Sequence, residues 1–173
     1  MDIALVPVPA RAFAWLFGLA FGPPVLTMIV LRLFNPGLST SVLAIVAAVV
    51  LVVGGIIGWA MGRHRMHVAS GHLILQASRL YRLEKPLADV DWSKARAGDL
   101  AHMTDVRTTL RTNGIGLPGY SAGWFRLANG SKAMLMLTDA SRVIVLPFAD
   151  GETLIASVED PESALEQLRA ASH

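Results

Sequence analysis

The chain has 173 residues, of which 53% are hydrophobic and 16% are charged, and its mean hydropathy is +0.50. These values are too apolar and too poor in charge for a typical soluble domain, so they predict a membrane protein. The net charge of +2 is small and comes from no basic tract, which argues against a nucleic-acid partner. The absence of Cys excludes a disulfide framework, a thiol nucleophile and a cysteine-ligated metal.

The N-terminal segment predicts an extended lead-in followed by a membrane-spanning helix. Residues 1–10 contain two prolines, which disfavour a helix there. Residues 12–31 are uncharged, which at about 1.5 Å per residue is long enough to cross a hydrocarbon core of roughly 30 Å, and we place the span at about 12–33. The sequence Gly22-Pro23-Pro24 predicts a kink or a break into two half-helices. Because no ionisable residue accompanies it at that depth, we interpret it as a bend rather than a transport site.

A second span follows a short turn at residues 35–40. Residues 42–61 are again uncharged, so we place this helix at about 41–61 and assign residues 1–62 to a two-helix anchor. Gly54, Gly58 and Gly62 recur every four residues, and Gly18 and Gly22 repeat that spacing in the first helix. This spacing favours close helix packing, either within the chain or with a neighbouring subunit.

The flanking charges predict the orientation of the helical hairpin. Arg11 precedes the first span, and Arg63 and Arg65 follow the second, whereas the connecting turn has no Lys or Arg. We therefore expect both termini in the cytoplasm, although Arg32 near the turn argues mildly for the opposite orientation. Trp15 and Trp59 are predicted to lie at the membrane interface, together with Arg63 and Arg65.

Residues 63–173 predict a second, mainly β domain. Two runs flanking Asn129-Gly130 predict a tight hairpin, and a third run after Asp139-Ala140-Ser141 extends it into an antiparallel meander. Asp160-Pro161-Glu162 predicts the start of a C-terminal helix. The strands that we expect are 66–69, 72–77, 79–83, 92–100, 123–127, 132–137, 142–146 and 153–158. For residues 92–100 a helix is an alternative of similar weight. Residues 103–111 are predicted as a helical turn or an irregular link, and residues 113–119 as a rigid glycine-proline loop.

The segment from Arg111 to Pro147 carries a family resemblance. This segment resembles the bacterial pleckstrin-homology-like (PH-like) domain family in its sequence R-T-N-G-I-G-L-P-G-Y, followed by G-W-F-R-L, N-G, L-T-D and V-I-V-L-P. The similarity extends from Met66 to the C-terminus. The resemblance implies a bent antiparallel β-sandwich or barrel, capped by a C-terminal α-helix that closes one end. It also implies a noncatalytic protein of the bacterial inner membrane, in a group of which some members form homo-oligomers.

Candidate binding residues are few. Arg107, Arg111, Arg126 and Lys132 form either an anion patch for lipid headgroups or an acidic peptide, or simply the solvated faces of strands. No dense Lys/Arg loop lies between the first strands, where Arg79, Arg82 and Lys85 are a thin substitute, so phosphoinositide binding is not implied.

The sequence predicts no catalytic, metal or cofactor site. His64, His67 and His72 lie close together but lack a third or fourth ligand at matched spacing. Ser121 in G-Y-S-A-G is followed by a predicted strand rather than the helix of a nucleophile elbow.

The leading functional hypothesis is a noncatalytic scaffold or binding module. It would act through self-association, or by binding another membrane protein or a peptide, at an exposed strand edge or beside the last helix. One alternative is a small oligomeric channel or transporter subunit. Another is an anionic-lipid-binding module.

Overall fold

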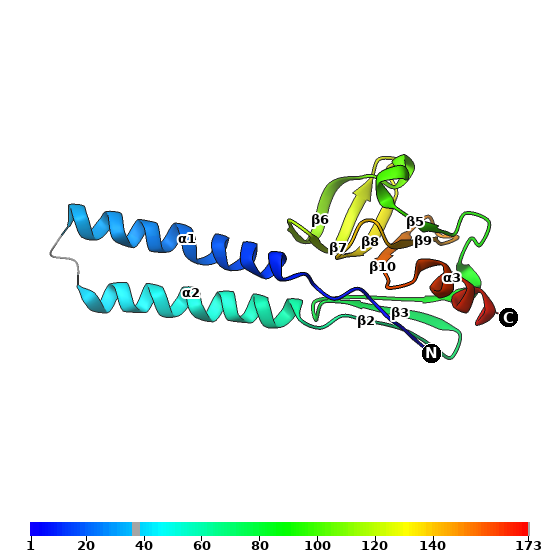
Figure 1. The fold of residues 1–173 in the computed structure, drawn as a ribbon, viewed down its shortest axis with the longest axis horizontal. Helices are drawn as coiled ribbons and strands as arrows, with labels where there is room; N and C mark the ends of the chain where they lie inside the picture. The colour runs from blue at the N-terminus through cyan, green and yellow to red at the C-terminus, as the bar shows by residue number, and fades with distance from the viewer. Residues whose placement is uncertain (36–38, 173) are drawn as a thin grey trace.

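Two long helices project from a β domain in the computed structural model, which describes residues 1–35 and 39–172 (Figure 1). Helix α1 spans Ala10–Phe34 and helix α2 spans Thr40–Met61. Residues 36–38 of the predicted turn lie outside the described residues. Helix α1 continues through Pro23 and Pro24, so the predicted break into half-helices is wrong. The hydroxyl of Thr27 donates a hydrogen bond to the carbonyl of Pro23 at 2.8 Å, one turn earlier.

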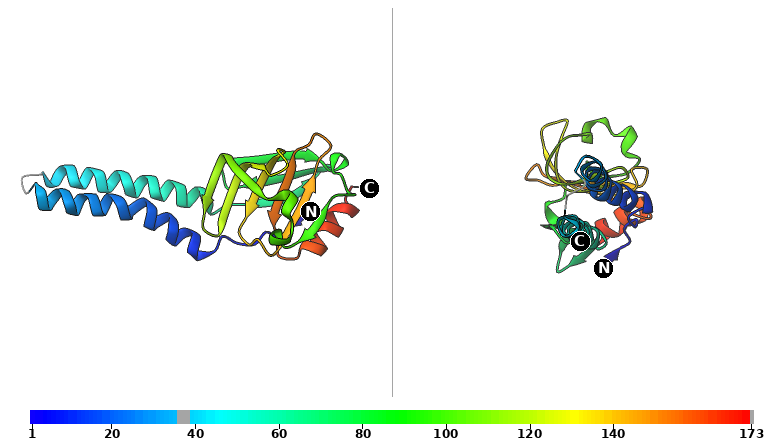
Figure 2. Two further views of the ribbon diagram at one scale, coloured as in Figure 1. Left: turned by 90° about the horizontal axis from the view of Figure 1, so that it is seen from above. Right: turned by 90° about the vertical axis from the view of Figure 1, so that its left-hand side faces the viewer.

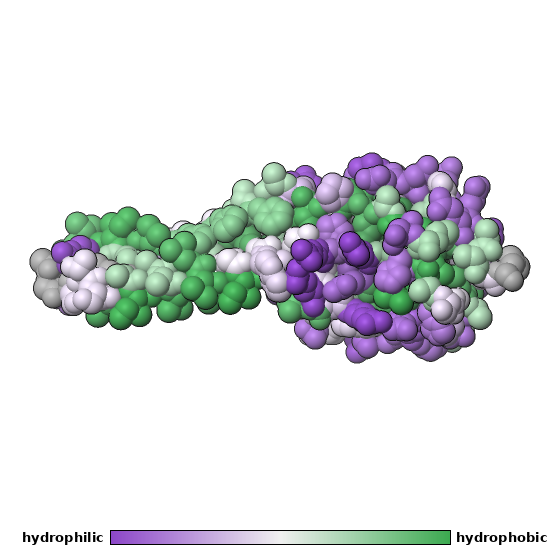
Figure 3. Space-filling model, turned by 90° about the horizontal axis from the view of Figure 1, so that it is seen from below, coloured by the Kyte–Doolittle hydropathy of each residue, from purple (hydrophilic) through white to green (hydrophobic). Residues whose placement is uncertain are grey.

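Both helices are long and apolar enough to cross a membrane. Large apolar side chains cover their outer surface, including Leu33, which is 73% exposed, and Ile45, which is 64% exposed. Figure 3 shows this apolar surface running along the hairpin and giving way to a hydrophilic surface on the β domain.

The glycines divide between the two sides of the hairpin. A Cβ added at Gly54 would lie 3.2 Å from the ring of Phe21, and one at Gly58 would lie 3.8 Å from Leu16, so both glycines face α1. A Cβ at Gly18 or Gly22 would meet no atom of the described residues within 4 Å. Gly62 is the C-cap of α2. Helix packing within the chain therefore uses the glycines of α2 and not those of α1.

The β domain consists of two sheets and a C-terminal helix, which confirms the predicted PH-like architecture (Figures 1 and 2). The four-stranded sheet has the order β1-β2-β3-β4, and the six-stranded sheet has the order β5-β9-β10-β8-β7-β6. The bounds are β1 Asp2–Ile3, β2 Arg65–Ala69, β3 His72–Ala77, β4 Tyr81–Pro86, β5 Arg96–Gly98, β6 Thr108–Leu117, β7 Tyr120–Leu127, β8 Lys132–Leu137, β9 Val143–Pro147 and β10 Thr153–Ser157. Helix α3, Pro161–Ala170, closes the end away from α1 and α2, and the side chain of its N-cap Asp160 accepts a hydrogen bond from Ser163 N.

The predicted β7–β8 hairpin is confirmed, but the meander is wrong. Strand β10 lies between β8 and β9, parallel to β8 and antiparallel to β9. Val143, Ile144, Val145 and Leu146 of β9 are all fully buried. A strand with no polar face needs cover on both sides and therefore belongs inside a sheet, with β10 on one side and β5 on the other.

Two further sequence predictions are corrected. Residues 113–117, predicted as a loop, belong to strand β6, and of the predicted strand 92–100 only Arg96–Gly98 forms a strand. The glycines in β6 permit close strand contact rather than a loop, since Gly114 lies directly opposite Gly123 of β7. A Cβ at Gly114 would stand 2.7 Å from the carbonyl oxygen of Ala122.

The core has two layers, one on each face of the six-stranded sheet. Met134 and Met136 of β8 face the layer shared with the four-stranded sheet and α3. Ala133 and Leu135 face the second layer, which is covered by Val106 and the short 3₁₀ turns Leu100–His102 and Thr104–Val106. This alternation follows from the two-residue period of a strand.

The lead-in, which the sequence places with the anchor, is hydrogen-bonded to both sheets. Strand β1 pairs with β2, and Leu5 forms an antiparallel bridge with Val158. The buried hydroxyl of Thr138 donates to the carbonyl of Val6 at 2.8 Å, and Val6 N donates to Ser157 O at 3.1 Å. The lead-in therefore runs along the β domain before the chain enters α1 (Figure 1).

Gly123→Ala should lower the free energy of unfolding by about 2–4 kcal/mol, because it combines backbone strain with overpacking. Gly123 has a φ of +116°, and its added Cβ would lie 2.5 Å from the carbonyl oxygen of Asn113. Gly116→Ala is the matched control on the paired strand, since its Cβ would meet only the flexible end of Arg111. Chemical denaturation measures both; equal stability of the two variants would contradict this packing.

A fragment of residues 63–173 should fold as a soluble β domain but should gain stability when residues 1–9 are joined to it through a Gly/Ser linker of about 15 residues. The reason is that the joined segment restores β1 and the Thr138 hydrogen bond. Thermal unfolding followed by circular dichroism should show a Tm at least about 5 °C higher in the joined form. Equal Tm values would mean that the lead-in contributes nothing to the domain.

Candidate functional site

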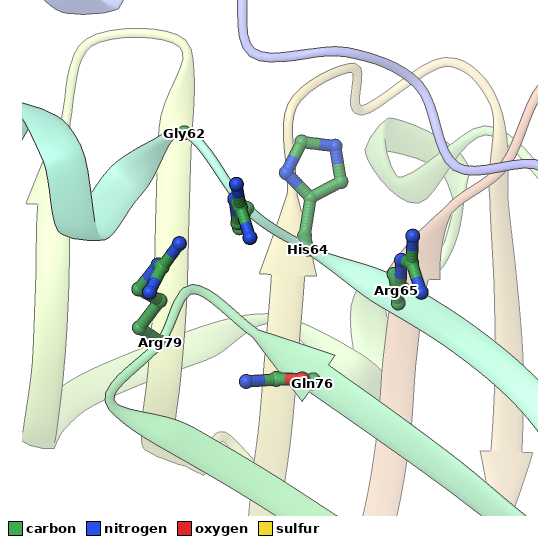
Figure 4. Close-up of a pocket in the computed structure, with 6 residues that line it drawn as sticks. Gly62, His64, Arg65, Gln76 and Arg79 are labelled. Atoms are coloured by element: carbon green, nitrogen blue, oxygen red, sulfur yellow. The ribbon is translucent and has the colours of Figure 1, made fainter.

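A basic hollow lies where α2 meets the β domain (Figure 4). Its volume is about 600 Å³, and we call it the basal hollow. None of the described residues that line it is acidic. The lining residues are Gly62, Arg63, His64, Arg65, Gln76 and Arg79.

The local fold brings these side chains together from two segments. Helix α2 ends at Met61 and β2 begins at Arg65, so residues 62–64 alone join the helix to the sheet. Arg65 and Gln76 are register partners on β2 and β3. After β3, the buried Ser78 adopts a left-handed φ of +59° and turns the chain back toward the helix.

Arg79 is held against the end of α2. Its backbone N–H donates to the carbonyl of Ala60 at 3.1 Å, and its guanidinium lies 3.6 Å from the centre of the Trp59 ring. A guanidinium over an indole face is a favourable cation–π arrangement. The buried Nε of Arg79 has no hydrogen-bond partner in the described part of the chain. The side chain is therefore positioned by the end of the helix.

His64 lies between the basal hollow and the lead-in. It also lines a second hollow together with Asp2, Ile3 and Leu5, and in Figure 4 its ring extends away from Gln76 and Arg79. Burial lowers the pKa of His64 below its ordinary value of 6.5, while the backbone carbonyl of Val6 acts in the opposite direction. Histidine is consequently neutral here at pH 7, and the positive charge of the hollow comes from its three arginines.

The side chains that line the basal hollow are of the types that bind anions. Arg63, Arg65 and Arg79 offer guanidinium donors, which suit the planar, bidentate binding of phosphate or carboxylate oxygens. Gln76 adds an uncharged donor and acceptor. A phosphate-bearing ligand would supply the negative charge that the lining lacks.

The predicted anion patch lies elsewhere and is only partly available. Lys132 pairs with Glu152 at 3.1 Å and lies 3.9 Å from the centre of the Trp124 ring. Arg126 is the register partner of Lys132 across β7 and β8. Arg111 is on β6, and Arg107 follows the 3₁₀ turn before it. Arg126 and Lys132 share one face of the six-stranded sheet with Trp124, whereas Arg111, the register partner of Phe125, lies on the other face. All four residues lie outside the basal hollow.

Of the three basic residues near the first strands, Arg82 and Lys85 form ion pairs and Arg79 does not, among the described residues. Arg82 pairs with Glu84 at 2.7 Å. Lys85 pairs with Asp150 and, at 3.1 Å, with Glu152, which joins β4 to the turn before β10. These ion pairs leave Arg79 as the one available for a ligand. Sequence reasoning missed its role because only the fold brings residue 79 beside residues 62–65.

Among the described residues, no group of three or more His, Cys, Asp or Glu side chains lies close enough together to hold a metal ion. Asp105 pairs with Arg96, while His102 lies 3.7 Å from Asp99.

Comparison with known protein families matches residues 77–172 to a family described as the bacterial PH domain. This match spans more than half of the chain and runs from the end of β3 to the end of the described C-terminal segment. The chain belongs to the bacterial PH domain family. No curated protein and no solved structure matches it. PH-like domains are generally noncatalytic binding modules. Within the basal hollow, the family match includes Arg79 but not residues 62–65 or Gln76.

His64→Gln should reduce the loss of stability that occurs on acidification. The unfolded chain protonates His64 near its ordinary pKa of 6.5, whereas the folded protein resists protonation, so stability falls as the pH drops below that value. We expect the difference in Tm between pH 7.5 and pH 5 to be smaller in His64→Gln than in the native protein. His102→Gln, which alters an exposed ring, is the control. Identical pH profiles for all three proteins would show that His64 is not held neutral.

Proposed function

We propose that the protein is a membrane-anchored PH-like module that binds the phosphate-bearing headgroups of anionic lipids in its basal hollow. The observation that carries the proposal is the position of three arginines, without an acidic neighbour among the described lining residues, directly after a helix of membrane-spanning length. This supports the anionic-lipid alternative among the hypotheses drawn from the sequence.

The length of α2 sets the depth of the hollow in a bilayer. Its 22 residues at about 1.5 Å each extend about 33 Å, which matches a hydrocarbon core of roughly 30 Å. Since residues 62–64 are the whole connection to β2, the hollow lies at the level of the headgroups. Each Lys or Arg near an anionic surface contributes about 1 kcal/mol of attraction.

The flanking residues support a cytoplasmic orientation in a bacterial inner membrane. Arg11, Arg63 and Arg65 lie at the domain end of the hairpin, so the positive-inside rule places the domain, and with it both termini, in the cytoplasm. Trp15 and Trp59, which are 50% and 61% exposed, lie near the same end and suit the interface. A channel has less support, because Arg32 is the only charged residue in the sequence between residues 12 and 61.

The experiment is native mass spectrometry of the full-length protein with added phosphatidylglycerol or phosphatidylcholine. We expect preferential retention of phosphatidylglycerol by the native protein. The double variant Arg65→Gln/Arg79→Gln should weaken that binding by about tenfold or more, because charge-assisted hydrogen bonds of about 1.5–3 kcal/mol each are lost. Arg82→Gln, which alters an exposed ion-paired arginine outside the hollow, is the matched control.

Competition with glycerol phosphate distinguishes a site for the phosphate headgroup alone from a site for the whole lipid. Displacement of the lipid by this soluble compound would show that the headgroup alone is recognised; resistance to it would show that the acyl chains also contribute. Equal retention of the two lipids, or undiminished phosphatidylglycerol binding in the double variant, would refute the proposal. Circular dichroism of each variant checks that loss of the Arg79–Trp59 contact leaves the fold intact.

A further inference from the structure

The six-stranded sheet ends in a long open edge. Strand β6 is its last strand, ten residues long, and its outer side pairs with no other strand within the described ranges 1–35 and 39–172. The opposite edge, β5, has only three residues. Every residue of β6 from Thr108 to Asn113 is exposed, including Leu110, whose exposed fraction is 60%. Open edges of this length expose unpaired backbone groups that favour the addition of another strand.

Strand β6 is nevertheless firmly attached to β7. The pairing contains two bulges, at Thr109 and Thr112. The Thr109 hydroxyl donates to the carbonyl of Arg126 at 3.0 Å, and the Thr112 hydroxyl donates to the carbonyl of Trp124 at 2.9 Å. These side-chain hydrogen bonds supply β7 with donors where the bulges interrupt the ladder. The outer side of β6 is therefore an ordered template and not a frayed end.

The charge around this edge has one sign. The sequence from Arg107 to Lys132 contains no Asp or Glu. In the part of the chain that the structure describes, Lys132 pairs with Glu152, whereas Arg107, Arg111 and Arg126 form no ion pair with a carboxylate. A second copy of the chain pairing through β6 would bring these arginines together. An acidic segment would complement them.

An apolar hollow adjoins the beginning of β6. Its volume is about 360 Å³, and its lining includes Leu100, Met103, Thr104, Arg107, Thr108 and Ala140. A strand added alongside β6 could place one apolar side chain there. Pockets for individual side chains are what give specificity to strand addition, while the backbone hydrogen bonds supply affinity.

The edge also lies next to the helical hairpin. Strand β6 is on the helix-proximal side of the domain (Figure 1), and the turn after it approaches α1, since a Cβ at Gly119 would collide with the Arg11 guanidinium. A segment that reaches this edge most directly belongs to a chain emerging from the same membrane.

We propose that β6 is a docking edge for an extended, acidic juxtamembrane segment of a partner membrane protein, which adds to the six-stranded sheet as a seventh strand. Its backbone pairs with the outer side of β6, its carboxylates lie beside Arg107 and Arg111, and one apolar side chain enters the hollow at Leu100 and Met103. This function is separate from headgroup binding in the basal hollow and rests on different residues.

The test uses the full-length protein in phosphatidylcholine nanodiscs and a synthetic peptide of about eight residues, long enough at about 3.3 Å per residue to cover the exposed part of β6. The peptide alternates Glu with Val or Thr and ends in Leu. Two further forms carry backbone N-methyl groups on the odd or on the even residues, which keeps every charge but removes half of the backbone donors. A fourth form has Lys in place of Glu.

We expect the acidic peptide to bind and to protect the β6 amides from hydrogen exchange. One N-methylated form should bind at least about tenfold more weakly than the other, because only one set of donors faces β6 in a strand pair. Binding should also weaken by about tenfold in Arg107→Gln/Arg111→Gln, should persist in the control Arg142→Gln, and should be absent for the Lys peptide.

Several results would overturn the proposal. They are no binding of the acidic peptide up to about 1 mM, equal binding of the two N-methylated forms, or undiminished binding in Arg107→Gln/Arg111→Gln. Protection of the outward-facing β6 amides, which do not pair with β7, in the absence of peptide would also overturn it. If that protection required phosphatidylglycerol in the nanodisc, the edge would be a membrane contact; if it accompanied dimerisation in phosphatidylcholine, the occupant would be a second copy.

Discussion

The arrangement of this protein depends on how firmly the helical hairpin is joined to the β domain at both of its ends. On one side, the lead-in is hydrogen-bonded through β1 to β2 and through Val6 to Thr138 and Ser157 before it enters α1. On the other, residues 62–64 alone separate α2 from β2. Neither connection is a flexible linker. The orientation of the domain relative to the helices is therefore fixed, and so are the surfaces of the domain that lie next to the helices. The basal hollow and the edge strand β6 both lie on that helix-proximal side (Figure 1).

The features that sequence predicts well are those decided by neighbouring residues. Two uncharged runs predict the two helices, Asn129-Gly130 predicts the β7–β8 turn, and Asp160 with Pro161 predicts the start of α3. Each of these signals acts over a few residues or within one helix, and each element is present in the structure. The resemblance of residues 111–147 adds the fold family, which the match over residues 77–172 shows.

The features that sequence does not predict depend on residues far apart in the chain. Strand order is one: the apolar runs within β9 and β10 predict that both strands are buried but not which strand each has as its neighbour. Strand β6 is another, because its glycines indicate a loop unless the facing Gly123 is known. The basal hollow is a third, since Arg79 joins residues 62–65 only through the pairing of β2 with β3 and the contact with Trp59.

The basic residues fall into two groups, those that form an ion pair with a carboxylate of the described residues and those that do not. Lys85 and Lys132 share Glu152, which links β4 and β8 to the strand that lies between β8 and β9. Only the Lys85 pair links the two sheets, because β8 and β10 are neighbours in the same sheet. The arginines of the basal hollow and those beside β6 have no such partner in the described residues, so their charge is available to a ligand outside the chain. Counting basic residues in the sequence cannot separate these groups.

Most of the residues that line the basal hollow lie outside the segment that matches the family. The lining residues come from the end of α2, from β2 and β3, and from the turn at Arg79, whereas the family match begins at residue 77. The part shared with the family therefore supplies one of the three arginines, and the junction with the hairpin supplies the other two. Trp59 of α2 also sets the position of the shared one. The anion recognition that we propose for this site would thus be a property of the joined hairpin and domain, and a PH-like domain without such a hairpin would have the turn but not the hollow.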